Sequence, residues 1–374
     1  MIKILHTADI HLDSPFSLKD PETAQSMRQS LRGTFTSAML FARTENVDIV
    51  LISGDVFDTG FASRDTLNLL KSEFEKNPGI RFVISPGNHD PYTANSPWAR
   101  TEFPSNVYIF RSSALHKFSF DDINTDVYGW AFTSDTMTVD PLAVKPNLDN
   151  TRINILCAHC EIEGPGGGKY CSITKAELEA AGFDYAAVGH IHKGSPQVQK
   201  VGRTYFAYPG CLEGRSFDEV GQKYALCGQI VKERGFASVD LSQRAFTQRR
   251  FEILDVDVTS ADDTAGIIAA VEAAMRDAHI TNDVSLRIVL RGRVSPSLII
   301  SEQFISTNVK GVRYAEVCDC TEPLFDYSSF EADPGIRGAF YRSMKPYLES
   351  GTEREKRIAA KALHAALQAL GGNN

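Results

Sequence analysis

Ile49-Val50-Leu51-Ile52-Ser53-Gly54-Asp55-Val56-Phe57-Asp58 is the stretch of this sequence that says most about its fold. The apolar, β-branched run at its start predicts a buried strand, and Gly54 lets the backbone turn sharply where that strand ends. The carboxylate of Asp55 is thereby presented at the strand tip. Further polar motifs also follow strand-like runs: Asp9-Ile10-His11, Gly87-Asn88-His89-Asp90, His159 and Gly189-His190-Ile191-His192.

Strand-like runs alternate with helical stretches around these motifs. Polar groups at the ends of several strands predict an α/β sandwich whose site lies at the carboxyl edge of a sheet. Predicted helices cover residues 23–44, 64–76 and 175–181. Predicted strands cover residues 2–6, 48–53, 81–85, 107–110, 127–130, 153–158, 185–188, 198–201, 204–207, 224–231 and 237–241.

The pattern changes near Arg249, where a strand, an Ala-rich helix and two further strands predict a small α+β accessory domain. Helical periodicity dominates after Pro323. We therefore predict three parts, residues 1–245, 246–325 and 326–374, the last of them a helical segment.

Length and composition are those of a globular protein with more than one core. A chain of 374 residues exceeds what one hydrophobic core usually fills. It is 43% hydrophobic and 23% charged, and it lacks an apolar run long enough for a membrane helix or a signal peptide. The 7 cysteines, an odd number without framework spacing, indicate reduced thiols. We expect a cytoplasmic protein that does not contact a membrane.

The motifs supply the residue types that a pair of divalent ions needs. Two cations about 3.5–4 Å apart can lower the pKa of a water and clamp a phosphate for in-line attack. Asp55 is the natural bridging carboxylate, and the amide oxygen of Asn88 suits a hard cation without adding negative charge. The other candidate ligands are Asp9, His11, His159, His190 and His192.

At these motifs the sequence resembles the calcineurin-like metallophosphoesterase superfamily, from residue 2 to about residue 231. The resemblance implies a four-layer α/β/β/α sandwich and phosphoester hydrolysis by a hydroxide held between two metal ions. One ion would take Asp9, His11, Asp55 and His192. The other would take Asp55, Asn88, His159 and His190. The native ion is expected to be Mn²⁺, although Fe²⁺, Zn²⁺ and Ni²⁺ accept the same donors.

The resemblance also implies roles for residues beside the ligands. His89 would act near the leaving group, and Asp90 is placed with it in the predicted catalytic pair. Asp90, Asp58 and Asp13 are candidates to orient histidines or waters. His6, His116, His279 and His364 have no motif context and are expected to be structural or surface residues.

Several stretches resemble the bacterial SbcD/YhaO branch of DNA repair nucleases within that superfamily. They are residues 4–16, Gly182-Phe183-Asp184-Tyr185, Tyr208-Pro209-Gly210 and Gly214-Arg215-Ser216-Phe217-Asp218-Glu219. The resemblance implies a manganese-dependent DNA exonuclease or endonuclease with an accessory cap domain. It also implies a coiled-coil ATPase partner docked through the C-terminal helices, and a homodimer.

Other activities of the superfamily are weighed against this one. A Ser/Thr protein phosphatase is disfavoured because Thr59 and Asp90 stand where those enzymes carry Arg and Glu. A cyclic-nucleotide phosphodiesterase stays open, although the chain continues well beyond a compact core. A non-catalytic scaffold is disfavoured because every expected ligand is present.

Binding of DNA would require local basic patches, because the formal net charge of the chain is -8. Two divalent cations would add positive charge where a phosphate must lie. Candidate phosphate contacts are Arg28, Arg32, Lys193, Lys200, Arg203, Arg249, Arg250, Arg291 and Arg293.

Overall fold

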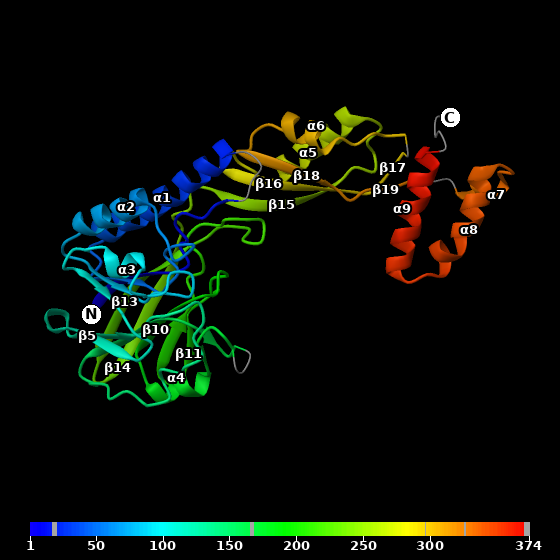
Figure 1. Ribbon diagram of the computed structural model, residues 1–374. Helices are drawn as coiled ribbons and strands as arrows, with labels where there is room; N and C mark the ends of the chain where they lie inside the picture. Colours follow the sequence, from blue (N-terminus) through cyan, green and yellow to red (C-terminus); the bar gives the residue numbers. More distant parts are fainter. Residues whose placement is uncertain (17–20, 165–167, 296, 325–326, 370–374) are drawn as a thin grey trace. The chain divides into compact units, whose positions relative to one another are not determined.

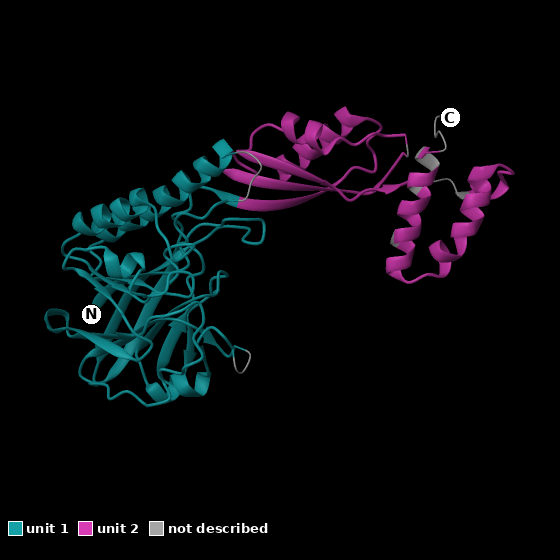
Figure 2. Cartoon of the chain, in the orientation of Figure 1, with its two compact units in different colours: residues 1–250 teal, residues 251–374 magenta. Residues whose placement is uncertain are grey.

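The computed structural model describes residues 1–16, 21–164, 168–295, 297–324 and 327–369, drawn as ribbons in Figure 1. These residues form two compact units, Met1–Arg250 and Phe251–Asn374 (Figure 2). The predicted division into three parts stays a prediction, and residues 326 and 370–374 of its last part lie outside the described residues.

The first sheet of unit 1 contains residues 49–52, the start of the stretch 49–58 described above, as one of its inner strands. Its strand order is β14-β13-β1-β2-β3-β4. Four neighbouring strands are parallel: β1 (Ile2–Thr7), β2 (Ile49–Ile52), β3 (Arg81–Ile84) and β4 (Val107–Ile109). β13 (Ala225–Glu233) runs antiparallel to β1, and β14 (Phe236–Arg244) continues from it as a hairpin. Three parallel carboxyl ends, those of β1, β2 and β3, therefore meet at one edge.

The second sheet has the order β11-β12-β10-β7-β6-β5. Its strands are β5 (His116–Phe120), β6 (Thr125–Gly129), β7 (Ile153–His159), β10 (Tyr185–Gly189), β11 (Gln199–Val201) and β12 (Thr204–Ala207). β6, β7, β10 and β12 are parallel, so that the carboxyl ends of β7 and β10 lie side by side. The predicted hairpin of residues 198–207 is present as antiparallel β11 and β12.

The main core of unit 1 lies between the two sheets. Alternate residues of the first sheet, such as Ile4, Leu51 and Val83, pack in one buried cluster with Ile155 and Ala187 of the second. This alternation places every second side chain of each strand on the inner face.

Helices cover the outer faces of the sandwich. On the first sheet, Phe74 of α2 (Arg64–Glu75) packs on Phe82 of β3, with ring centroids 4.4 Å apart, and α1 (Pro21–Thr44) runs beside α2 (Figure 1). On the second, Leu178 of α4 (Lys175–Ala181) packs with Leu156 and Val188. The arrangement confirms the predicted four-layer α/β/β/α sandwich.

Shorter elements complete unit 1. They are α3 (Pro97–Arg100), a 3₁₀ helix (Asp121–Ile123), β8 (Glu161–Ile162) and β9 (Ser172–Ile173). Helix α4 begins with a capping box in which Thr174 and Glu177 exchange side-chain and backbone hydrogen bonds. It ends at Gly182, whose φ of 76° is the left-handed cap that glycine adopts freely.

Unit 2 contains a small α+β fold and a group of helices. Its three-stranded sheet has the order β15 (Arg250–Asp257), β16 (Val284–Arg291), β18 (Tyr314–Asp319). Helices α5 (Thr264–Asp277) and α6 (Glu302–Asn308) share one core with this sheet, and β17 (Arg293–Val294) pairs with β19 (Glu322–Pro323). The helices α7 (Tyr327–Ala332), α8 (Ile336–Ser350) and α9 (Glu353–Ala369) follow. None of the helices described is long and apolar enough to cross a membrane.

Candidate metal centre

The seven predicted ligands lie at or just beyond the carboxyl ends of five strands. Asp9 and His11 follow β1, Asp55 follows β2, and Asn88 follows β3. In the second sheet His159 is the last residue of β7, and His190 and His192 follow β10. Because both sheets end at the same side of the sandwich, residues from distant parts of the sequence come together there.

The loops that carry the ligands have an unusual backbone. Asp9, His11, Asp55 and His190 have φ values of 48°, 49°, 51° and 98°, a region that side chains other than glycine adopt rarely. The surrounding hydrogen bonds hold this conformation, since Asp9 N donates to Gly54 O at 3.1 Å and His11 N donates to Asp55 O at 2.9 Å. Such strain concentrates at functional sites, where the fold over-determines the backbone.

Gly54 is required in this loop for two reasons. Its φ is +92°, and a Cβ at this position would lie 2.2 Å from Nδ1 of His159. The glycine thus allows the turn and makes room for a ligand from the second sheet.

One group of ligand atoms gathers around the Nε2 atoms of His11 and His192, which lie 3.2 Å apart. Oδ2 of Asp55 lies 3.8 Å from His11 Nε2, and Oδ1 of Asp9 lies 4.0 Å from His192 Nε2. Two imidazoles and two carboxylates therefore surround one point, the set predicted for the first ion.

A second group gathers around Nε2 of His159. That atom lies 3.0 Å from Oδ1 of Asn88, 3.3 Å from Nδ1 of His190 and 3.4 Å from Oδ2 of Asp55. Nδ1 of His159 lies 2.9 Å from the carbonyl of Ser53, a contact that directs Nε2 toward the other ligands.

The two groups share one oxygen of Asp55. Oδ2 belongs to both, whereas Oδ1 accepts a hydrogen bond of 3.0 Å from the backbone N–H of His89. The carboxylate is thus fixed with one oxygen engaged and the other directed between the two ligand groups. This is the geometry that a bridging carboxylate requires.

The buried carboxylates of the site favour the binding of cations. Asp9, Asp55 and His159 are buried, and the ion pairs found for the two carboxylates within the described chain are all with histidines. Burial raises the pKa of Asp9 to about 6, with Asp55 adding to the effect and His159 opposing it. Burial alone would lower the pKa of His159, yet Asp55 and Asp9 raise it to about 9. The pocket favours positive charge.

These residues fit two divalent ions. Imidazole, carboxylate and amide donors converge in two sets with a shared oxygen, and buried carboxylates without Lys or Arg need a cation. Three clusters that could hold a metal are formed by described residues. Asp9-His11-His192 lies within the first group, Asp9-Asp55-His159 combines residues of both groups, and His11-Asp58-His89 includes one ligand of the first group.

His89 has a different environment from the ligands. Its side chain is exposed, its ring meets that of His11 edge-on at 4.9 Å, and Nδ1 lies 2.9 Å from the carbonyl oxygen of Asp58. The carbonyl accepts from Nδ1–H, and Nε2 is left to exchange a proton with a substrate oxygen.

Asp90 does not contribute to the reacting surface, and its predicted place in the catalytic pair is corrected here. The side chain is fully buried and accepts hydrogen bonds from the backbone N–H groups of Asp55, Val56, Phe57 and Gly87. It ties the loop after β2 to the loop after β3. Asp90 therefore positions backbone, and not a histidine or a water.

Of the two remaining candidates, Asp58 contacts a candidate metal ligand, whereas Asp13 contacts residues elsewhere. Oδ1 of Asp58 lies 3.3 Å from His11 Nδ1, so Asp58 does contact a ligand as predicted. Asp13 instead pairs with Arg32 at 2.8 Å and accepts from Ser63 and Thr66 at the start of α2.

Two further residues beside the site had no predicted role. Glu161 Oε1 lies 3.2 Å from His190 Nε2, and the Tyr170 ring packs on the His190 ring with centroids 4.9 Å apart. Glu161 follows His159 by two residues, a spacing that could have drawn attention to it. The position of Tyr170 depends on the fold of residues distant in sequence.

The basic residues proposed as phosphate contacts are mostly engaged. Arg249 is fully buried and pairs with Glu213 at 3.0 Å, which overturns its prediction as a phosphate contact. Carboxylates also pair with Arg32, Arg203, Arg291 and Arg293. Arg28 donates to the Pro15 carbonyl. Lys193 and Lys200 are exposed and have no ion pair among the described residues.

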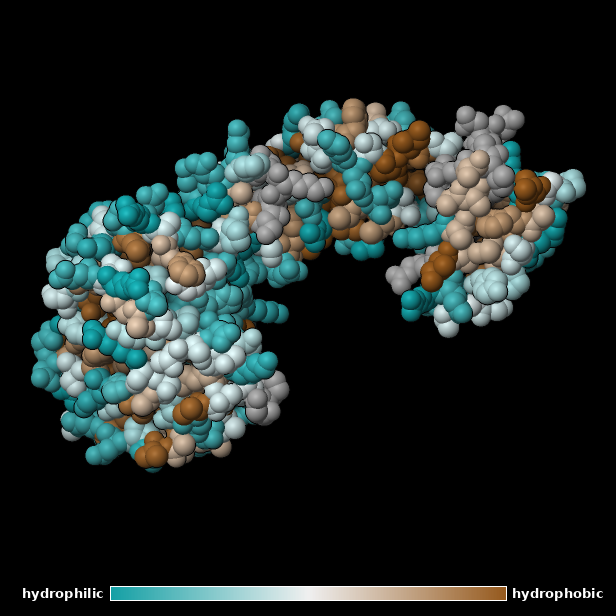
Figure 3. Space-filling view, viewed as in Figure 1, coloured by the Kyte–Doolittle hydropathy of each residue, from teal (hydrophilic) through white to brown (hydrophobic). Residues whose placement is uncertain are grey.

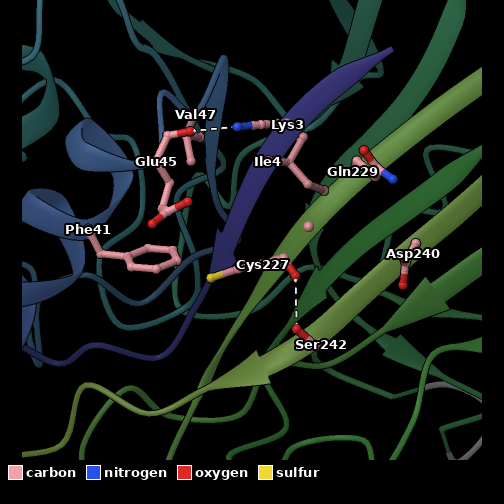
Figure 4. Close-up of a pocket in the computed structure, with 10 residues that line it drawn as sticks. Lys3, Ile4, Phe41, Glu45, Val47, Cys227, Gln229, Asp240 and Ser242 are labelled. Carbon is pink, nitrogen blue, oxygen red and sulfur yellow. Dashed lines mark hydrogen bonds between the residues drawn. The ribbon is translucent and has the colours of Figure 1, made fainter.

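A surface pocket of about 240 Å³ lies apart from the ligands, between the first sheet and α1 (Figure 4). Lys3, Phe41, Cys227 and Asp240 are among its lining residues. None of the lining residues belongs to either ligand group.

Comparisons with known proteins show which family the chain resembles. A calcineurin-like phosphoesterase profile matches residues 2–194. The chain is 30% identical over 302 residues to an uncharacterized metallophosphoesterase, YhaO, of Bacillus subtilis, covering 78% of this chain and 72% of that protein.

Solved structures also resemble the chain. A dimetal phosphatase from Danio rerio has a TM-score of 0.40 and 11% identity, covering 66% of this chain and 99% of that one. TT1561 of Thermus thermophilus has a TM-score of 0.35 and 11% identity, covering 60% of this chain and 93% of that one. The profile spans more than half of the chain, and the Bacillus relative is matched over most of its length. This chain belongs to the calcineurin-like phosphoesterase family.

Proposed function

We propose that this metal-dependent phosphoesterase is a phosphodiesterase that hydrolyses DNA with two divalent ions, preferably Mn²⁺. One observation carries the proposal: two ligand groups share Oδ2 of Asp55 beside the exposed side chain of His89. Two ions bound there would activate water and neutralise the charge of a phosphate.

Different residues of the protein would bind the two ions and protonate the departing oxygen. Asp9, His11 and His192 would hold one ion, Asn88, His159 and His190 the other, and Asp55 both. The backbone N–H of His89 orients Asp55, while the His89 side chain would hold a proton for the departing oxygen. The Asp58 carbonyl keeps that ring in place.

Two features support a DNA substrate. The stretches around Asp184, Pro209 and Phe217 resemble the SbcD/YhaO branch of DNA repair nucleases. Lys193, one residue beyond the ligand His192, is exposed and available for a backbone phosphate, and Lys200 is a second exposed cation in the following strand.

A small cyclic nucleotide is the second candidate substrate. It is favoured by the engagement of most basic candidates with carboxylates, which leaves few side chains to follow a polyanion. A substrate with one phosphate needs little beyond the two ions.

A substrate panel separates the two candidates. The protein with added Mn²⁺ is given single-stranded DNA, double-stranded DNA, a cyclic nucleotide and a phosphoprotein, with Asp55→Ala as the inactive control. We expect degradation of DNA and no turnover of the phosphoprotein. Turnover of the cyclic nucleotide alone would replace the DNA proposal by the second candidate. Repeating the active reaction with Fe²⁺, Zn²⁺ and Ni²⁺ tests the preference for Mn²⁺.

A further inference from the structure

A polar network lies behind the first ligand group, on the side away from the ligand atoms. Nδ1 of His192 lies 2.6 Å from Oε1 of Glu219, and Nδ1 of His11 lies 3.3 Å from Oδ1 of Asp58. Each histidine therefore has a carboxylate at the nitrogen opposite its ligand nitrogen.

Arg215 joins the two carboxylates. Its guanidinium donates to Oδ1 of Asp58 at 2.6 Å and to Oε1 of Glu219 at 2.9 Å, and its backbone N–H donates to Oε2 of Glu219 at 2.7 Å. Asp58, Arg215 and Glu219, called here the carboxylate clamp, thus form one connected unit around His11 and His192.

The clamp has a consequence for the ligand atoms. At His192 the Glu219 carboxylate accepts the N–H of Nδ1 at 2.6 Å and so fixes the tautomer in which Nε2 carries the lone pair. At His11 the Asp58 carboxylate lies 3.3 Å from Nδ1 and favours the same tautomer by its charge, although the two atoms are not aligned as a hydrogen bond. The two Nε2 atoms then face one another at 3.2 Å, the arrangement that a shared cation needs. Orientation of both rings is set by one planar guanidinium, whose fork suits two carboxylates.

We propose that Arg215 and Glu219 are positioning residues that, through Asp58 and His192, preorganise one of the two metal sites and leave the other unaffected. The proposal rests on the metal-binding part of the proposed function but not on its DNA substrate. The second ligand group has its own supports, the Ser53 carbonyl at His159 and the Glu161 carboxylate at His190.

Two arguments, one from charge and one from the orientation of the histidine rings, predict opposite effects on metal affinity when Arg215 is replaced. Removing a positive charge beside a divalent cation should strengthen binding if simple electrostatics decided the affinity. Removing the link between Asp58 and Glu219 should weaken binding if the orientation of the rings decides it. The clamp therefore predicts weaker binding in Arg215→Met, a variant of similar length without hydrogen-bond donors.

Glu219→Gln is the sharper substitution. The two Glu219 oxygens accept from donors on both sides, from His192 and the guanidinium at Oε1 and from the Arg215 backbone at Oε2. An amide has one oxygen, so its NH₂ group must face a donor. If the NH₂ faces His192, the ring takes the other tautomer and its proton points into the metal site.

The experiment is a titration of the metal-free full-length protein with Mn²⁺ alone, followed by calorimetry and by the electron paramagnetic resonance of free Mn²⁺. Wild type is expected to bind two ions. In Glu219→Gln and Arg215→Met, one binding step should weaken by about 10–100-fold, the usual effect of losing a partner of a metal-binding histidine. The other step should keep its affinity.

Asp218→Asn is the matched control. Asp218 is exposed, is adjacent to Glu219, and its carboxylate contacts Ser216 rather than a ligand, so the change removes the same charge without touching the clamp. It should bind both ions as wild type does.

Two results would overturn the proposal. One is unchanged affinity at both steps in Glu219→Gln. The other is equal weakening of both steps together with a lower thermal midpoint of the metal-free variant, which would indicate a general structural role. Loss of DNA cleavage is not used as a readout, so a wrong substrate would leave this result interpretable.

Discussion

His89 differs from the seven candidate ligands because its side chain is exposed while its backbone N–H donates to the Asp55 carboxylate that the two ligand groups share. We expect His89→Ala to retain both ions, since the backbone donor survives the substitution. Turnover should fall by about 10²–10⁴-fold, the usual contribution of a positioned acid or base. Single-turnover rates with Mn²⁺, measured beside the metal stoichiometry, check this. His116→Ala, at another exposed histidine, is the control; an unchanged rate in His89→Ala would remove the residue from the chemistry.

His6 gives the protein a pH dependence unrelated to substrate. It is fully buried, with Nδ1 2.8 Å from the Tyr185 hydroxyl and Nε2 3.2 Å from the Ser53 hydroxyl. Burial lowers its pKa from 6.5 to about 3. Between these values the unfolded chain binds a proton that the folded chain does not, so the free energy of unfolding should fall by about 1.4 kcal/mol per pH unit as the pH decreases.

Urea unfolding between pH 7.5 and 4, with a chelator to remove metal effects, measures this contribution. The difference between wild type and His6→Gln should change with pH by the stated slope below pH 6.5 and stay constant above it. Parallel curves across the whole range would mean that His6 does not titrate as described.

The candidate ligands could be found from the sequence because each follows a strand in a recognisable motif. Of their partners, Asp58 was a candidate from its motif, whereas the others could not be found in this way. Glu219 lies 27 positions from His192 and meets it through the fold alone. Arg249 is one of two adjacent arginines in the sequence and was predicted to contact phosphate. It is instead buried, and its ion pair with the Glu213 carboxylate accounts for this burial. His6 has no motif, and only the contact with Tyr185 reveals its environment.

In the loop after β2, Gly54 allows the chain to turn at the end of the strand and packs against the candidate ligand His159. In Gly54→Ala the new Cβ would lie 2.2 Å from His159 Nδ1, and the φ of +92° would be strained for alanine. We expect a loss of stability of more than about 1 kcal/mol and a loss of the ion held by His159. Gly60→Ala, in the same loop with nothing within 4 Å, is the control for thermal unfolding and Mn²⁺ binding. Equal behaviour of the two variants would contradict the packing of His159 against this loop.

The central strands were predicted closely, whereas several short or exposed elements were missed. The strands of residues 48–53, 81–85 and 153–158 were predicted within one or two residues of β2, β3 and β7, because strands buried on both faces form continuous apolar runs. β5 (His116–Phe120) was missed, since an edge strand with exposed His116 and Lys117 lacks that run. The short helices α3 and α6 were also missed, as propensity is weak over so few residues.

The C-terminal helices carry the untested expectation of a partner. Ile336, Tyr347 and Ile358 are 68%, 54% and 57% exposed, whereas Leu363 is buried beside Tyr341. Figure 3 shows scattered hydrophobic residues among hydrophilic ones on the visible surface of the molecule. The sequence of the last helix predicts that Ile358, Leu363, Leu367 and Leu370 lie near one face. Of these residues, Leu370 and the Leu367 side chain lie outside the described part of the structure. A coiled-coil ATPase partner and a homodimer stay predictions.

The net charge of -8 makes the salt dependence of DNA binding a decisive property of the protein. Each phosphate contact releases counterions and contributes about 0.9 to the slope of log K against log salt. Lys193 and Lys200 are exposed, and no described carboxylate forms an ion pair with either. If both contact phosphates, Lys193→Ala/Lys200→Ala should reduce the slope by about 1.8 units.

Fluorescence anisotropy of labelled double-stranded DNA between 50 and 200 mM salt measures this slope. The binding measurement uses the His89→Ala background with Mn²⁺, so that the DNA stays intact while the ions remain bound. Lys145→Ala/Lys175→Ala, at two other exposed lysines of unit 1, removes the same charge and should leave the slope unchanged. A slope near zero in all variants would mean that the ions alone bind the phosphate, and it would favour a small nucleotide as the substrate.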